Sequence, residues 1–140
     1  MIAEAAQQLF SLVQAIPALA SSTGLAAGGK TPDPGGTKMP LPFAWIVADG
    51  AENTQDISRP LVPVNATTRI GYSVILYVPN IGQADLIANQ FPLLETIIQA
   101  VHGQVAPTGQ RWFWKGYKLT VFNADRLCYR LAFLLDAAIS

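Results

Sequence analysis

A phosphate-binding pattern is the first candidate for chemistry in this sequence. Residues 24–31 read Gly-Leu-Ala-Ala-Gly-Gly-Lys-Thr and match every fixed position of G-x-x-x-x-G-K-[ST]. Such a loop holds phosphate when a strand precedes it and a helix begins at its lysine. Here a helical pattern ending at Pro17 precedes it, and Pro-Asp-Pro-Gly-Gly follows at residues 32–36. We interpret the segment as a flexible loop, with a nucleotide-binding enzyme as an alternative.

Other catalytic or metal-binding sets are incomplete. Cys128 and His102 are the only cysteine and histidine, so neither an intrachain disulfide nor a Cys/His metal cluster can form. No third group that would orient a Cys128–His102 pair is evident. Asp49, Glu52 and Asp56 lack the spacing of a calcium loop and fit a solvated acidic loop. The sequence predicts no catalytic residue, no metal ligand and no cofactor.

An aromatic cluster offers a third kind of chemistry. Trp112, Phe113 and Trp114 lie beside Arg111 and Lys115, a composition that can stack single-stranded bases. The chain carries nine basic and nine acidic side chains, so no overall field attracts nucleic acid. We interpret Trp112 and Trp114 as core or protein-interface residues and keep a single-stranded nucleic-acid binder as an alternative.

Composition predicts one packed domain over residues 1–140. Hydrophobic residues make up 51% of the chain and charged residues 13%, unlike a disordered protein. No apolar run approaches the roughly 20 residues of a membrane span, and the N-terminal segment lacks the basic residues of a signal peptide. Residues 1–105 sum to −3 and residues 106–140 to +3. A neutral, polarised chain favours self-association.

The first third of the chain predicts a helix, a loop and a strand. Apolar residues recur at helical spacing from Ile2 to Ile16, and Pro17 ends this helix. Residues 20–42 hold five glycines and four prolines, which predicts a long loop. A short strand is expected over residues 43–48, followed by a polar loop that carries the three acidic residues.

The middle of the chain predicts a strand and a second helix. Residues 67–78 alternate between apolar and mixed positions, typical of a half-buried strand. The next helix closes at Gly103, with a kink or restart at Pro92. Its predicted apolar stripe comprises Ile87, Phe91, Leu94, Ile98 and Val101.

The last part of the chain predicts a three-stranded meander. Its strands are expected at residues 111–114, 117–122 and 126–135, with a turn at Lys115–Gly116. In the final strand the odd positions 127–135 form an apolar face opposite Arg126, Cys128 and Arg130. The fold class is therefore α+β, a mainly antiparallel sheet of about five strands with two helices packed on one face.

This order of elements, and above all residues 112–139, resembles the tail terminator proteins of long-tailed bacteriophages, particularly the Mu-like group. In that family an aromatic residue, a short glycine turn, a leucine-bearing strand, an acidic turn and a final strand of the type R-L-x-Y-x-L-x-F recur. The matching positions here are Trp114, Gly116, Leu119, Asp125, Arg126, Leu127, Tyr129, Leu131 and Phe133. The loop at residues 20–42 has no counterpart in this resemblance.

The resemblance implies a structural virion protein of the tail or neck, assembled in the host cytoplasm. It implies a homohexameric ring that ends tail-tube polymerisation and binds the tail tube protein and the head-proximal connector protein. Genomic DNA would pass through the lumen without sequence recognition. No enzyme activity, cofactor or membrane is implied, and another neck or head–tail joining protein is the alternative.

A contact between copies is expected on the polar face of the final strand. Arg126 and Arg130 project away from the apolar side, and the acidic residues Asp49, Glu52 and Asp56 can reach a neighbouring copy. We therefore expect the arginine face of one subunit to meet the acidic loop of the next. Two solvated arginines are the alternative, in which case Trp112–Trp114 become the next interface candidates.

Overall fold

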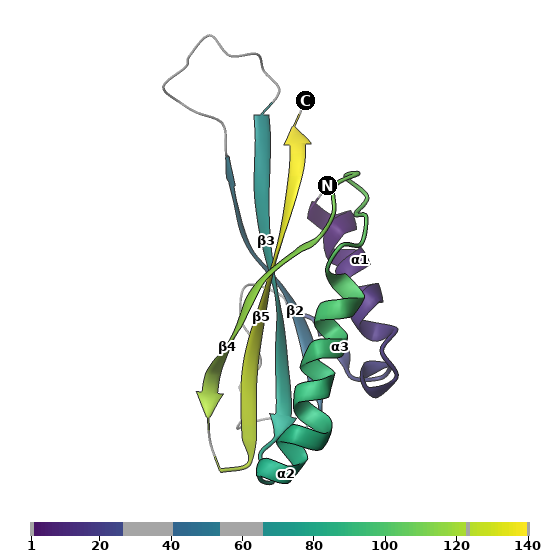
Figure 1. Ribbon diagram of the computed structural model, residues 1–140. Coiled ribbons are helices and arrows are strands. Elements are labelled where there is room, and N and C mark those ends of the chain that lie inside the picture. Colours follow the sequence, from purple (N-terminus) through teal and green to yellow (C-terminus); the bar gives the residue numbers. More distant parts are fainter. Residues whose placement is uncertain (1, 27–40, 54–65, 123, 140) are drawn as a thin grey trace.

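The chain folds into a five-stranded sheet with two helical segments (Figure 1). The computed structural model describes residues 2–26, 41–53, 66–122 and 124–139. Strand order is β1-β2-β3-β5-β4; β1 pairs with β2 in parallel, and the other pairs are antiparallel. The α+β class and the mainly antiparallel sheet are confirmed. The elements are α1 (Ile2–Gln14), η1 (Pro17–Leu19), β1 (Thr23–Leu25), β2 (Phe43–Asn53), β3 (Ala66–Pro79), α2 (Gln83–Asp85), a π-helical turn η2 (Leu86–Gln90), α3 (Phe91–Val101), β4 (Phe113–Phe122) and β5 (Arg126–Ile139).

One hydrophobic cluster joins both helical segments to the sheet. Ala5, Leu9 and Val13 of α1 are buried, and Pro17 begins η1 after α1 has ended at Gln14. Apolar residues of α3 and alternate residues of β2, β3 and β5 belong to the same cluster. Alternation of side chains along each strand puts these residues on one face of the sheet. The strand residues involved include Ala44, Ile46, Ile70, Tyr72, Val74, Leu76, Val78, Leu127, Tyr129, Leu131, Phe133 and Leu135.

The central strand β3 is buried on both faces over part of its length, which corrects the half-buried prediction. Every residue from 72 to 78 is buried. Ile75, Tyr77, Val47 and Cys128 form a second cluster on the opposite face, against partly buried residues that include Trp45. β3 lies between β2 and β5, so its neighbours exclude water on both sides.

A short strand, β1, lies inside the segment predicted as a loop over residues 20–42. Thr23 pairs with Ala44 and Leu25 with Ile46. A Cβ atom at Gly24 would come within 2.7 Å of the Trp45 indole ring, so glycine permits this close approach. Three residues are too few to give a sequence period. Residues 27–40, including most of the phosphate-binding pattern, lie outside the described residues.

Strand β2 continues well beyond its predicted end. It runs to Asn53, so Asp49 and Glu52 lie in a strand rather than in a polar loop. A bulge between Ala48 and Gly50 interrupts the pairing with β3 at Asp49. Because the bulge breaks the alternation of side chains, the sequence pattern does not show that the strand continues past Ala48. Asp56 lies outside the described residues.

The second helical segment packs the later part of the predicted stripe, Leu94, Ile98 and Val101, into the main core, but not its first two residues. Ile87 and Phe91 are 59% and 41% exposed, whereas Leu93 and Ile97 are buried. The π-helical turn η2 adds a residue to one turn and rotates the residues before it relative to α3. Pro92 lies in the first turn of α3, in agreement with the expected restart. Gly103 has a φ of +85° just beyond the helix end, as its predicted role requires.

Strand β4 is one element where two strands were predicted. The Lys115–Gly116 dipeptide is not a hairpin turn: pairing with β5 continues through a bulge between Trp114 and Gly116. Glycine suits both a turn and a bulge, so the sequence alone does not separate them. β5 is also longer than expected and reaches Ile139. Two strands therefore replace the predicted three-stranded meander.

Polar contacts fasten α1 to the rest of the molecule. The Trp112 indole N–H donates to Gln8 Oε1 over 2.7 Å, and Gln8 Nε2 donates to the Val105 carbonyl over 2.8 Å. The Tyr72 hydroxyl donates to the Ile2 carbonyl over 3.0 Å, and its ring packs edge-on against Trp112 at 5.2 Å between centroids. Trp112 is 1% exposed and belongs to the core.

Removal of the Trp112 indole should destabilise the fold strongly. Trp112→Ala loses a buried ring and its hydrogen bond, so the free energy of unfolding should fall by about 3–5 kcal/mol. The neighbouring Phe113 is exposed, and Phe113→Ala should change it by less than about 1 kcal/mol. Urea titrations followed by circular dichroism measure both values. Equal losses in the two variants would contradict the placement of Trp112 in the core.

Stability should fall at alkaline pH because Tyr72 is buried. Burial, with a smaller effect of the Glu4 carboxylate, raises the pKa of Tyr72 to about 12. An unfolded tyrosine ionises near pH 10, so the contribution of neutral Tyr72 is complete below about pH 10 and declines as the pH rises toward 12. Urea midpoints between about pH 8 and 11 should show this loss, and Tyr72→Phe should reduce it. Tyr117→Phe, at an exposed ring, serves as the control. An unchanged loss in Tyr72→Phe would refute the assignment.

Candidate assembly interface

The polar face of β3 and β5 carries Arg126 and Arg130, two of the five charged residues predicted to mediate assembly. We call it the open face and define it by Arg69, Ser73, Arg130, Leu134 and Asp136. These positions alternate with the core residues of the same strands and therefore project from the other side of the sheet. Among the described residues, no helix residue belongs to the hydrophobic cluster on that side.

A hydrogen-bonded ion pair lies on the open face. The Arg130 guanidinium pairs with the Asp49 carboxylate and donates from Nε to Ser73 Oγ over 2.9 Å. The Ser73 hydroxyl in turn donates to Asp49 Oδ2. Ser73 is fully buried, so its polar atom depends on these two partners.

Strand register and one bulge bring Asp49 and Arg130 together. β3 lies between the strands that carry them, and Asp49 is the residue at the β2 bulge. The bulge re-aims its side chain toward β3 and β5. The sequence placed Asp49 and Arg130 on facing surfaces of two copies, and the structure joins them within one chain. Their part in a contact between copies stays a prediction.

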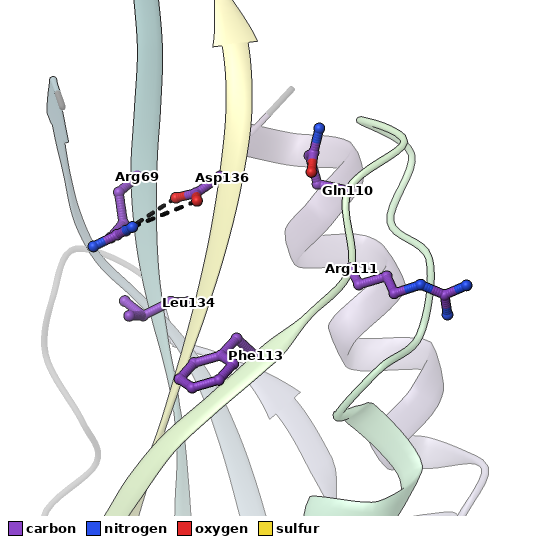
Figure 2. A pocket seen from close by; sticks show the side chains of 6 residues that line it. All are labelled: Arg69, Gln110, Arg111, Phe113, Leu134 and Asp136. Carbon is purple, nitrogen blue, oxygen red and sulfur yellow. Dashed lines mark hydrogen bonds and ion pairs between the residues drawn. The ribbon is translucent and has the colours of Figure 1, made fainter. Parts of the chain in front are cut away.

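A second ion pair borders a shallow pocket on the open face. Arg69 Nε donates to Asp136 Oδ1 over 3.0 Å, next to a pocket of about 300 Å³ that Phe113 and Leu134 also line (Figure 2). The Arg111 side chain points away from this ion pair in Figure 2 and donates to the Gly103 carbonyl over 2.7 Å.

A second pocket, of about 410 Å³, adjoins the first through their shared lining residues Arg69 and Leu134. Gly50 and Gly71 lie opposite each other in adjacent strands and leave the surface low there. Lys115 lines the other side of this pocket. The two pockets form a depression across β2, β3, β5 and β4 that is suited to protein contact.

The remaining predicted interface residues lie in different environments. Trp114 is partly buried, packs against the core, and has a buried indole N–H without a hydrogen-bond partner among the described residues. Trp112 is buried, so it offers no surface for base stacking. Arg126 begins β5 opposite Pro79, and Glu52 lies opposite Arg69 in the backbone register.

Sequence reasoning included Phe113 in the range Trp112–Trp114 but missed Tyr117, Lys118 and Leu119 of β4, which are also exposed. Phe113 and Tyr117 are 57% and 56% exposed, and Leu119 is also exposed. Lys118 lies opposite Arg130 and so projects from the open face. The sequence did show large apolar residues between lysines here, a pattern that fits an edge strand. The turn expected at Lys115–Gly116 divided that strand into two, so the pattern was not recognised.

Cysteine and histidine have structural partners. Burial raises the pKa of the Cys128 thiol, which also accepts a hydrogen bond from the Thr120 hydroxyl. His102 Nδ1 accepts the Trp114 backbone N–H over 3.0 Å. Within the described ranges no three His, Cys, Asp or Glu side chains are grouped as metal ligands require. None of the helices described there combines the length and apolar character that crossing a bilayer requires.

Known proteins resemble this chain in structure rather than in sequence. No protein-family model matches the sequence, and no curated protein matches it. Among solved structures, 25 chains match. One belongs to a structure described as "Virion of native gene transfer agent (GTA) particle", with a TM-score of 0.63 and 14% identity over 99% of this chain and 97% of that chain. This likeness shows a shared fold over nearly the full length of both chains.

Loss of the Arg130 side chain should destabilise the monomer. Arg130→Ala leaves Asp49 and the buried Ser73 without their donor, and the free energy of unfolding should fall by about 1–2 kcal/mol, since the guanidinium is partly exposed. Lys118→Ala, on the adjacent strand, should change it by less than about 0.5 kcal/mol. Urea titration of the two variants tests this difference. Equal stability of the wild type and Arg130→Ala would show that the ion pair contributes no net stability.

Proposed function

We propose that this protein is a structural component of a tailed, phage-like particle and forms a homohexameric ring at the end of its tail tube. The observation that carries the proposal is the fold shared with a chain of a gene transfer agent virion. The likeness covers 99% of one chain and 97% of the other, so it involves the whole fold rather than one common motif. It supports a structural rather than an enzymatic virion role, and the position in the tail or neck is part of the proposal.

The β4–β5 hairpin supports the narrower proposal of a tail terminator. The residues that resemble that family begin with Trp114, next to a bulge at Gly116, and continue through Asp125 into β5. Tyr129, Leu131 and Phe133 of this pattern are core residues. Part of the resemblance therefore reflects core packing. Only its exposed positions can contribute to binding other proteins.

The proposed ring ends tube polymerisation and joins the tail to the head. One ring surface binds the tail tube protein, the other binds the head-proximal connector protein, and genomic DNA passes through the lumen without sequence recognition. Assembly takes place in the host cytoplasm. A different neck or head–tail joining protein is the second candidate, because the virion likeness supports either position.

The contact first expected between copies remains part of this proposal. Arg126 and Arg130 of one copy would face Asp49, Glu52 and Asp56 of the next. Arg130 and Asp49 already pair within one chain, so their contribution to assembly would require an exchange of partners or a shared network.

Deletion of the gene from the producing genome tests the function. Particles should fail to mature, with heads that lack tails and tubes of uncontrolled length, because nothing caps the growing tube. Native mass spectrometry of released neck complexes should find six copies of 15.0 kDa, about 90 kDa in total. The protein supplied from a plasmid restores tail length and serves as the control.

Two outcomes would overturn the terminator proposal. Tails of normal, uniform length that fail to join heads would assign the protein to another head–tail joining role. A dimer as the only assembled state would exclude a closed ring on a tube. Electron micrographs of the deletion particles and mass measurement separate these outcomes.

A further inference from the structure

Two exposed patches of this chain have opposite charge and both contain apolar groups. The first, the β4 patch, consists of Phe113, Lys115 and Lys118. Phe113 is 57% exposed and lines the pocket of about 300 Å³, while Lys115 lines the pocket of about 410 Å³. Lys118 projects from the open face opposite Arg130. Asp136 and Asp49 line the same two pockets but are paired with Arg69 and Arg130, so Lys115 and Lys118 leave the β4 patch basic.

The second patch lies on the helical segment that contains η2 and α3. This α3 patch consists of Ile87, Phe91 and Glu95, which follow one another at four-residue spacing along one side of the helical segment. Ile87 and Phe91 are 59% and 41% exposed. No lysine or arginine occurs between residues 70 and 110, so the α3 patch is locally acidic.

The two patches belong to different layers of the molecule. Buried residues of α3 pack in the main core, on one face of the sheet, whereas Lys118 and Phe113 are paired with residues of the opposite, open face. Two different surfaces that complement each other form a heterologous contact. Repeated copy after copy, such a contact closes into a ring when its rotation divides a full turn.

We propose that the α3 patch of one copy docks on the β4 patch of the next copy. The occupant is a second copy of this chain because the charges are complementary: Glu95 faces Lys118, and Lys115 lies on the same strand as Lys118. The apolar side chains at the contact also match, since Ile87 and Phe91 would cover Phe113 and the adjoining pocket. The ionic groups then fix register and orientation. This inference rests on the proposed ring and names its subunit contact.

Disulfide cross-linking tests the contact directly. Glu95→Cys and Lys118→Cys are combined in one chain, and the native Cys128 is buried and so reacts slowly. In assembled particles, mild oxidation should give a ladder of linked chains up to six, which reduction collapses to the monomer. Either single variant should give no ladder. Particles that contain the double variant but give only monomer would overturn the contact, and dimers from one single variant would indicate a two-fold contact instead.

Charge reversal gives an independent readout. Lys118→Glu alone and Glu95→Lys alone should each reduce incorporation into particles on the order of tenfold, through like-charge repulsion. The two together should restore most of it. Gln14→Lys introduces a lysine on exposed α1, outside both patches, and should leave incorporation unchanged. Failure of the combined variant to recover would overturn the pairing.

The failure of this inference can be separated from that of the proposed function. If wild-type particles hold six copies but the cross-link and reversal variants behave like the wild type, the ring stands and its contact lies elsewhere. If wild-type particles hold no ring of this chain, the proposed function fails first. Reduced DNA binding by Lys118→Glu with normal incorporation would assign the β4 patch to nucleic acid and refute the contact between copies.

Discussion

The ladder between β3 and β5 is the constraint on which the rest of the structure depends. It pairs residues without interruption from Ala66 opposite Ile139 to Pro79 opposite Arg126. Both strands keep strict alternation, so the register assigns every apolar residue of one set to the main core and every residue of the other set to the open face. A slip of one position would exchange these faces. The helices can pack only on the side to which this ladder directs its apolar residues, and β2 and β4 pair with its outer edges.

The open face keeps its charged groups because they are paired within the chain. Arg130 with Asp49, and Arg69 with Asp136, link three of the five strands across this face. Ser73 joins the first pair and is itself buried. Such ion pairs contribute modestly to stability when they are partly exposed, but they hold their charged groups to partners within the chain. Among the described residues, Lys115 and Lys118 of the edge strand β4 are exposed cations.

The distribution of charge connects the fold to assembly. The helical segment that contains α3 carries acidic but no basic residues, and the edge strand β4 carries basic but no acidic residues. These two elements lie on different layers of the fold. A small sheet with a pocketed, partly apolar open face also leaves area for a neighbouring subunit. These properties suit a subunit of the proposed ring.

Sequence by itself determined the elements whose period is regular: α1, β3, the core face of β5 and the glycine end of α3. It also argued against a phosphate-binding loop and a Cys/His metal cluster, because both depend on residue types and local context, and most of that loop lies outside the described residues. It missed β1, divided β4 in two and misplaced the stripe before Phe91, so the correct strand number arose from errors that cancelled. Only the tertiary structure decided that Asp49 meets Arg130, 81 positions away. Periodicity reports which face a residue occupies, whereas bulges, π-helical turns and contacts between distant strands depend on how those faces pack together.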